Sequence, residues 1–154
     1  MIDSTADTPG EEAAEAPAAT APTAAPRELD PAEADRLFRE GVSLFSATRY
    51  WYAHEAWEKL WRAAPPEERD FYQGLIQVAA GLLHLERRNL RGARNKLGEG
   101  LARLDRFQPT HRGIIVSELI AGCAPLLAQL RQGYLPYLIP PVIKYVEIEP
   151  DWSR

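Results

Sequence analysis

The stretch HEAWEKLW, from His54 to Trp61, holds the residue types in this chain that are most able to do chemistry. Histidine followed by glutamate opens the zinc-protease motif H-E-x-x-H, in which two histidines one helical turn apart bind zinc and the glutamate acts as general base. Here the second histidine is missing, and Trp57 and Glu58 follow instead. The stretch therefore predicts either another kind of polar site or one packed face of a helix.

A pair of neighbouring helices would bring further polar groups to this face. On a helix over residues 50–64, a rotation of about 100° per residue places five side chains within one arc of about 100°: Tyr50, His54, Trp57, Glu58 and Trp61. On a helix over residues 67–88, Gln73, Gln77 and His84 fall within about 60°. Because a short turn joins the two helices, we expect them to be antiparallel neighbours. We therefore predict one polar seam, with Glu55 at its rim, lined by His54, Glu58, Gln73, Gln77 and His84.

Three readings of this seam stay open. Buried polar groups normally satisfy one another, so the seam can be a hydrogen-bond network that fixes how the helices pack. Two histidines and a carboxylate (His54, Glu58 and His84) can instead bind zinc or ferrous iron. The third reading is a pocket for an organic ligand, with Glu58 or His54 as a general base. The chain carries no nucleophile motif and no phosphate-binding loop, and we assign no metal and no cofactor.

A basic segment begins at the end of the second of these helices. Residues 86–112 carry eight arginines and lysines against three acids, a net charge of +5. Four arginines stand at the start of the next helix, whose free amides also attract anions: Arg87, Arg88, Arg91 and Arg94. They form a candidate anion patch, and the alternative is the solvated face of a helix. The interleaved aromatic residues of single-strand readers are missing, so we do not expect a nucleic acid partner.

Helical spacing of apolar residues predicts the elements that position these groups. Asp30 and Pro31 suit the start of the first helix, Pro65 and Pro66 separate the second from the third, and Asn89 caps the fourth. The predicted helices cover residues 31–47, 50–64, 67–88, 90–107 and 117–132. The fold class is therefore all-α, a compact bundle of about five helices with an extended C-terminal tail.

The C-terminal part of the chain is less regular. Pro125 lies inside the fifth predicted helix and predicts a kink or a late start there, and Gly133 ends that helix. Residues 114–116 are expected to be extended. The proline-rich segment after Gly133 is expected to wrap over the bundle in extended form, with a short strand at IKYVEI.

The composition sets the limits of the domain. The chain has 154 residues, which suits one core. Residues 1–28 are rich in Ala, Pro and Glu and nearly devoid of large apolar side chains, so we predict a disordered tail. Residues 29–148 form the predicted helical domain, and residues 149–154 a C-terminal tail. Residues 1–30 carry seven acids and one base, which leaves the rest near neutral at +2 and gives no electrostatic case for nucleic acid.

The compartment follows from what the sequence lacks. No run of about 18 apolar residues occurs, so no membrane span is expected. The acidic N-terminus does not have the pattern of a secretory signal, and the cytoplasm is the expected compartment. Cys123 is the one cysteine, which excludes an internal disulfide, and its apolar neighbours predict a buried thiol.

HEAWEKLW, followed by ERDFYQGLIQVAAGLLHLERRNLRGARNKL, is similar to the Domain of Unknown Function 309 family of small helical proteins from bacteria and plastids. The family pattern resembles H-E-x-W-E-x-x-W, a Gln-Gly-Leu-Ile-Gln run, a histidine, and Gly-Ala with leucines; Arg88 stands where the family has glycine. The resemblance covers about residues 40–107 and implies an all-helical fold but no activity. It marks as signature positions His54, Glu55, Trp57, Glu58, Trp61, Gln73, Gly74, Gln77, His84, Gly92 and Ala93.

The helix pair from Glu67 to Leu104 also resembles one tetratricopeptide unit, which favours protein binding. We therefore interpret the protein as a non-enzymatic interaction or structural module whose partner is a protein or small ligand. The alternative is a small-molecule or metal-binding protein, a hydrolase among the options, that uses His54, Glu58 and His84. An exposed apolar groove beside a closed seam would favour the first reading. An open pocket that reaches these side chains, with a shifted pKa, would favour the second.

Overall fold

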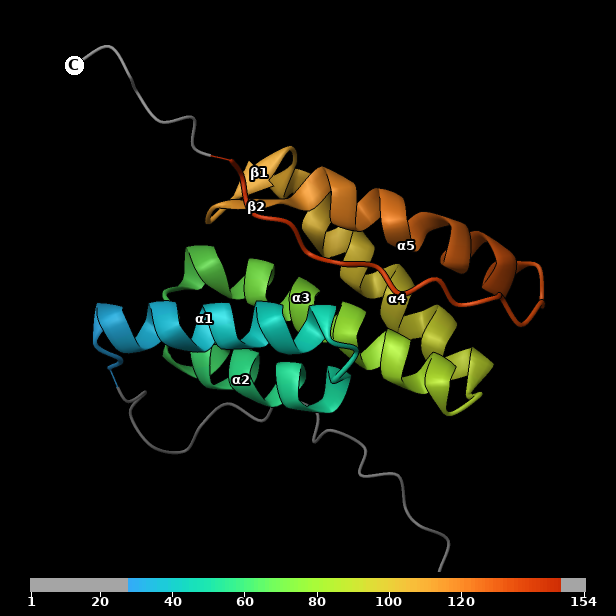
Figure 1. The fold of residues 1–154 in the computed structure, drawn as a ribbon, viewed down its shortest axis with the longest axis horizontal. Coiled ribbons are helices and arrows are strands. Elements are labelled where there is room, and N and C mark those ends of the chain that lie inside the picture. The colour runs from blue at the N-terminus through green and yellow to red at the C-terminus, as the bar shows by residue number, and fades with distance from the viewer. Residues whose placement is uncertain (1–27, 148–154) are drawn as a thin grey trace, which may run out of the picture.

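A computed structural model describes residues 28–147, which fold into five α-helices and a two-residue-per-strand hairpin (Figure 1). The helices are α1 (Pro31–Ser46), α2 (Tyr50–Ala63), α3 (Pro66–Glu86), α4 (Leu90–Leu104) and α5 (Val116–Arg131). A 3-10 turn, η1 (Asp105–Phe107), and the strands β1 (Thr110–His111) and β2 (Ile114–Ile115) connect α4 to α5. The all-α prediction is confirmed. The predicted disordered tail up to residue 27 and the predicted C-terminal tail lie outside the described residues.

The helix boundaries follow the local signals in the sequence. The Asp30 carboxylate accepts a hydrogen bond from the Ala32 amide at 3.4 Å, and the Asn89 side chain accepts one from the Gly92 amide at 3.0 Å. The last three residues of the predicted fourth helix form η1 instead. The predicted late start of the fifth helix is wrong, because α5 begins at Val116 and runs through Pro125. Pro125 is exposed, while six buried apolar residues on the other face of α5 anchor the helix.

The α1–α2 and α3–α4 pairs are built alike. In each pair the first helix ends in a three-residue turn whose middle residue has a positive φ, 62° at Thr48 and 59° at Arg88. The amide of Arg49 donates to the Leu44 carbonyl, and that of Asn89 donates to the His84 carbonyl, both at 2.8 Å. These positions differ by forty residues in the chain. The structure therefore contains an internal repeat of two helical hairpins.

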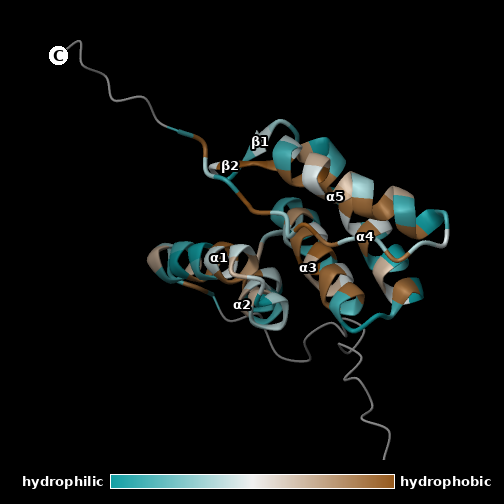
Figure 2. Cartoon of the chain, turned by 45° about the vertical axis from the view of Figure 1, so that its right-hand side comes forward, coloured by the Kyte–Doolittle hydropathy of each residue, from teal (hydrophilic) through white to brown (hydrophobic). Residues whose placement is uncertain are grey.

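The core runs between successive helices. α3 packs against α2 on one side and α4 on the other, and α5 covers α4 (Figures 1 and 2). Trp57 is fully buried, and its Nε1 donates to the Phe38 carbonyl at 3.3 Å. α3 has buried residues on most of its circumference, as expected of a central helix. Among the described helices, none combines the length and apolarity that a membrane span requires.

The segment after α5 runs back over the molecule in extended form, as predicted. It leaves α5 at Gly133, where φ is +83°, and passes between α5 and α1 (Figure 1). The Ile143 amide donates to Ser46 Oγ on α1 at 3.3 Å, and Lys144 Nζ lies 3.4 Å from Glu118 Oε2 on α5. The Ile115 amide also donates to the Lys144 carbonyl at 2.9 Å. This segment therefore ties the first helix to the last.

Candidate functional site

His54 is buried on α2 and paired within its own helix. Its Nε2 lies 3.4 Å from Glu58 Oε1, and Glu58 Oε2 lies 3.7 Å from the Arg62 guanidinium. The imidazole stacks on the ring of Trp51, with centroids 5.5 Å apart and planes 15° apart. Only 5% of His54 is exposed, and its Nδ1 has no hydrogen-bond partner among the described residues. The histidine is therefore held in place on one side and unsatisfied on the other.

The charge state of His54 follows from this burial. Burial lowers the pKa of His54, while the nearby Glu58 and Glu55 carboxylates act to raise it. The burial effect is the larger one, so the imidazole is neutral at pH 7. Protonation of the imidazole would place a charge in the core, which costs free energy. His54 is therefore better suited to a structural role than to the role of a general acid.

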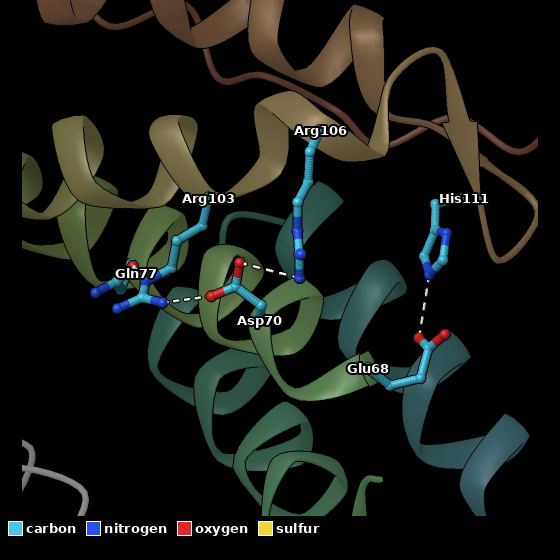
Figure 3. Close-up of polar contacts among 6 residues, drawn as sticks. All are labelled: Glu68, Asp70, Gln77, Arg103, Arg106 and His111. Atoms are coloured by element: carbon cyan, nitrogen blue, oxygen red, sulfur yellow. Dashed lines mark hydrogen bonds and ion pairs between the residues drawn. The ribbon is translucent and has the colours of Figure 1, made fainter. Parts of the chain in front are cut away.

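Gln77 belongs to a different network, on the side of α3 that faces α4 (Figure 3). Its side-chain amide donates to Glu99 Oε2 at 2.9 Å, and its Oε1 accepts from Arg103 Nε at 3.0 Å. Arg103 also forms an ion pair with Asp70, and the Arg106 guanidinium lies 3.2 Å from the other Asp70 oxygen. Gln77 is only 5% exposed, so both ends of a buried amide are satisfied from α4.

His84 lies at the turn between α3 and α4. Its Nδ1 is 3.2 Å from the Asn89 side-chain amide nitrogen. Burial, and then the positive charges of Lys96 and Arg87, lower the pKa of His84. Gln73 is half-buried, and Glu55 is exposed on α2.

The predicted single seam therefore resolves into three separate polar groups, one at His54 and Glu58, one at Gln77 and one at His84. In the described chain no hydrogen bond or ion pair joins His54 or Glu58 on α2 to the predicted residues of α3. The reason lies in the glycines of α3 and α4. A Cβ on Gly81 would stand 2.7 Å from Leu97 Cγ, and one on Gly100 would stand 2.9 Å from the Gly74 carbonyl. This close approach makes α4 the main partner of α3, and the Gln77 face meets α4 instead of α2.

A further polar cluster, around His111, was not predicted from the sequence. His111 Nε2 lies 3.1 Å from Glu68 Oε2 (Figure 3), and the His111 ring packs against Phe71 with centroids 4.5 Å apart. The Arg112 guanidinium lies 5.8 Å from the Phe38 ring centroid and 5.6 Å from that of Tyr72. The cluster fastens the β1–β2 hairpin to α1 and α3. The sequence around position 111, DRFQPTHRG, holds one large aromatic residue, Phe107, and no pattern there indicated the cluster.

Two surface hollows of the described chain lie away from most of the predicted site residues. Within residues 28–147 no group of three or more His, Cys, Asp and Glu side chains could hold a metal ion. One hollow lies between β2, α5 and residues 143–147, and another between α1 and α2. Of the predicted pocket residues, Glu55 alone lines one of these two hollows.

The candidate anion patch is exposed. Six arginines elsewhere in the described chain form ion pairs with carboxylates, whereas the four of the patch form none there. The four are Arg87, Arg88, Arg91 and Arg94. Their guanidinium groups are left to solvent or to an anion.

The C-terminal segment carries most of the exposed apolar side chains. Eight large hydrophobic residues are exposed in the described chain, and one of them, Tyr52, lies on α2. The other seven lie between residues 134 and 146, and we call them the apolar strip: Tyr134, Leu135, Tyr137, Ile139, Val142, Tyr145 and Val146. Large exposed apolar patches are rare on monomeric proteins, and they often mark a surface that binds another molecule.

Comparison with known proteins finds a similarity over most of the two hairpins. Residues 38–95, from α1 into α4, match the family described as Domain of unknown function (DUF309), which confirms the resemblance found in the sequence. A 72-residue segment is 36% identical to "Uncharacterized protein YpuF" of Bacillus subtilis (strain 168). The alignment covers 46% of this chain and 40% of the length of that relative. The family match ends before α5, so the apolar strip lies outside it.

Proposed function

We propose that this protein is a non-enzymatic interaction module that binds a partner through the apolar strip. The family that residues 38–95 match is described as one of unknown function. The observation that carries the proposal is the concentration of exposed apolar side chains on one short segment. Tyrosines 134, 137 and 145 are part of the strip, and tyrosine is enriched at the energetic centres of protein interfaces. We also propose the cytoplasm as the compartment, in keeping with a single buried cysteine that remains a free thiol.

The way the segment is held supports a binding role. Pro136, Pro141 and Ile143 point inward and are buried, whereas Tyr137, Ile139 and Val142 point outward. The inward side chains fix the segment against the bundle, so the outward ones are presented on a backbone that is already ordered. Because the segment is already ordered before it binds, association costs less conformational entropy.

The state of the polar clusters supports the same reading. Gln77 is satisfied at both ends, and His54 is buried and neutral at pH 7. Neither is reached by the two surface hollows described above. A closed polar interior beside an exposed apolar surface is what a structural network and a binding surface would produce.

A second candidate is a small-molecule-binding role for His54 and Glu58. The observation that favours it is the buried His54 Nδ1, which has no partner among the described residues. Tyr50, one turn away on the same helix, has a buried hydroxyl in the same condition. A ligand with a hydrogen-bond donor would satisfy His54 Nδ1. Anion binding at the four exposed arginines is a separate proposal.

The binding role is tested by a photo-cross-linking residue, p-benzoylphenylalanine, placed in the full-length chain. Position 137 samples the apolar strip, and position 52 is the matched control, because Tyr52 is also an exposed tyrosine. We expect one defined, identified partner at position 137 that is lost when Ile139→Asp is added. The same spread of adducts at both positions would show that the strip is not a binding surface.

A further inference from the structure

We propose that the partner of the apolar strip is a second copy of this chain, with two strips packed antiparallel across a two-fold axis near Ile139. This inference rests on the proposed function, since it names the occupant of the same surface. An isologous contact of this kind requires a surface that is complementary to itself. Area, charge and backbone geometry each bear on that requirement.

The area is of the size that a dimer needs. The seven strip residues have exposed fractions from 38% at Tyr145 to 88% at Tyr137. With about 200 Å² for a whole tyrosine, these fractions amount to roughly 700 Å². Standard interfaces bury about 800 Å² per partner. The strip alone therefore provides most of one side of a stable contact.

The charge pattern is compatible with self-association. No charged residue occurs from position 132 to position 143, and an antiparallel arrangement about Ile139 would set Lys144, the charged residue within the span of the strip, opposite Tyr134 of the other copy, so no like charges would face each other. Charges also flank the strip, Arg131 at one end and Glu147 at the other; neither forms an ion pair within the described chain, whereas Lys144 inside the strip pairs with Glu118. An antiparallel arrangement about Ile139 brings the Arg131 end of one copy to the Glu147 end of the other.

The backbone favours side-chain packing over a continuous strand ladder. Within the described chain, main-chain groups of residues 135–142 form no hydrogen bond. Pro136, Pro140 and Pro141 lack an amide hydrogen, which interrupts any ladder. We therefore infer that Tyr137 and Ile139 form the centre of the contact, where each packs on the strip of the other copy.

Sedimentation equilibrium of the full chain tests this inference. We expect the wild-type mass to rise from 17.3 kDa toward twice that value with concentration, over a range of about 1–200 µM. The double variant Tyr137→Asp, Ile139→Asp should weaken association by at least about 30-fold. Both side chains are exposed, so the variant should keep the wild-type unfolding curve. The control Tyr52→Asp should dimerise as the wild type does.

The outcomes separate this inference from the proposed function. A wild-type chain that stays at 17.3 kDa throughout overturns the dimer, and a double variant that dimerises normally overturns the strip as its interface. If such a monomer still cross-links at position 137 to one other identified protein, the binding role stands and the partner is different. If the chain is monomeric and the cross-linking at positions 137 and 52 is the same, both the proposed dimer and the proposed binding role of the strip are wrong.

Discussion

Gly41 on α1 lies directly under the indole of Trp57 on α2, so close that a Cβ on residue 41 would stand 2.1 Å from Trp57 Nε1. The same relationship recurs in the second hairpin, where Gly81 lies under Leu97. A glycine in the first helix and a large side chain in the second thus set the helix spacing in both halves of the repeat. Trp57 is fixed further by its hydrogen bond to the Phe38 carbonyl.

Gly41→Ala should destabilise the fold, although alanine is the better helix former. The new methyl would overlap a fully buried indole that cannot move without losing its hydrogen bond, so we expect a loss of at least about 2 kcal/mol. Urea unfolding measures the change in the free energy of unfolding. Ser43→Ala, at an exposed site on the same helix, is the control and should change it by less than about 0.5 kcal/mol. Equal stabilities would show that the glycine is not needed for the spacing.

The buried His54 predicts a dependence of stability on pH. Burial lowers the pKa of His54 below its ordinary value of 6.5, so the unfolded state binds the proton more readily. The contribution of His54 to stability is therefore fully present above pH 6.5 and is lost as pH falls through the lower pKa of the folded state. Unfolding curves from about pH 7.5 to 5 should show a smaller loss for His54→Gln than for the wild type. The pKa of His84 is also lowered, so His84→Gln should reduce the loss further when added. Identical pH profiles would contradict this account of His54.

Arg103 should matter through the buried amide that it satisfies. Arg103→Ala leaves Gln77 Oε1 buried without its donor, and we expect a loss of about 1–3 kcal/mol in the free energy of unfolding. Arg94→Ala removes an exposed arginine that has no ion pair in the described chain, and it should have almost no effect. Thermal or urea unfolding of the two variants side by side makes the comparison. Equal effects would mean that the network of Gln77 contributes nothing to stability.

His84 can report on the candidate anion patch. The positive charges of Lys96 and Arg87 help to lower its pKa, so an anion bound at the patch should raise it. NMR titration of His84 with and without inorganic phosphate, at constant ionic strength, measures this. Arg87→Gln combined with Arg91→Gln should abolish the phosphate effect. A pKa of His84 that ignores phosphate would leave the arginines as a solvated surface.

The helices could be predicted from the sequence because their boundaries are local. Pro65, Pro66 and the Asn89 cap act within a few residues of themselves, and the structure follows them. The repeat was harder to recognise. Glycine is the usual residue at a turn position with positive φ, but Thr48 and Arg88 occupy these positions here. The two turns therefore share no residue that would reveal the repeat in the sequence.

The partners of the polar residues could not be predicted in the same way. Helical spacing groups Gln77 with His84 but does not say which neighbour that face meets. The glycines at positions 74, 81 and 100 decided it by drawing α4 close. The apolar strip was also hidden, because the prolines among its residues obscured the alternation of inward and outward side chains that the structure reveals.

Disulfide cross-linking between copies tests the central claim most directly. Cys123 is buried, and burial raises the pKa of its thiol to about 12, so an introduced cysteine supplies the reactive thiol. Ile139→Cys lies at the middle of the strip, and Tyr52→Cys is the exposed control. Under mild oxidation we predict that the Ile139→Cys chain becomes a covalent dimer much faster than the Tyr52→Cys chain. Equal rates for the two variants would contradict the strip as the interface between two copies.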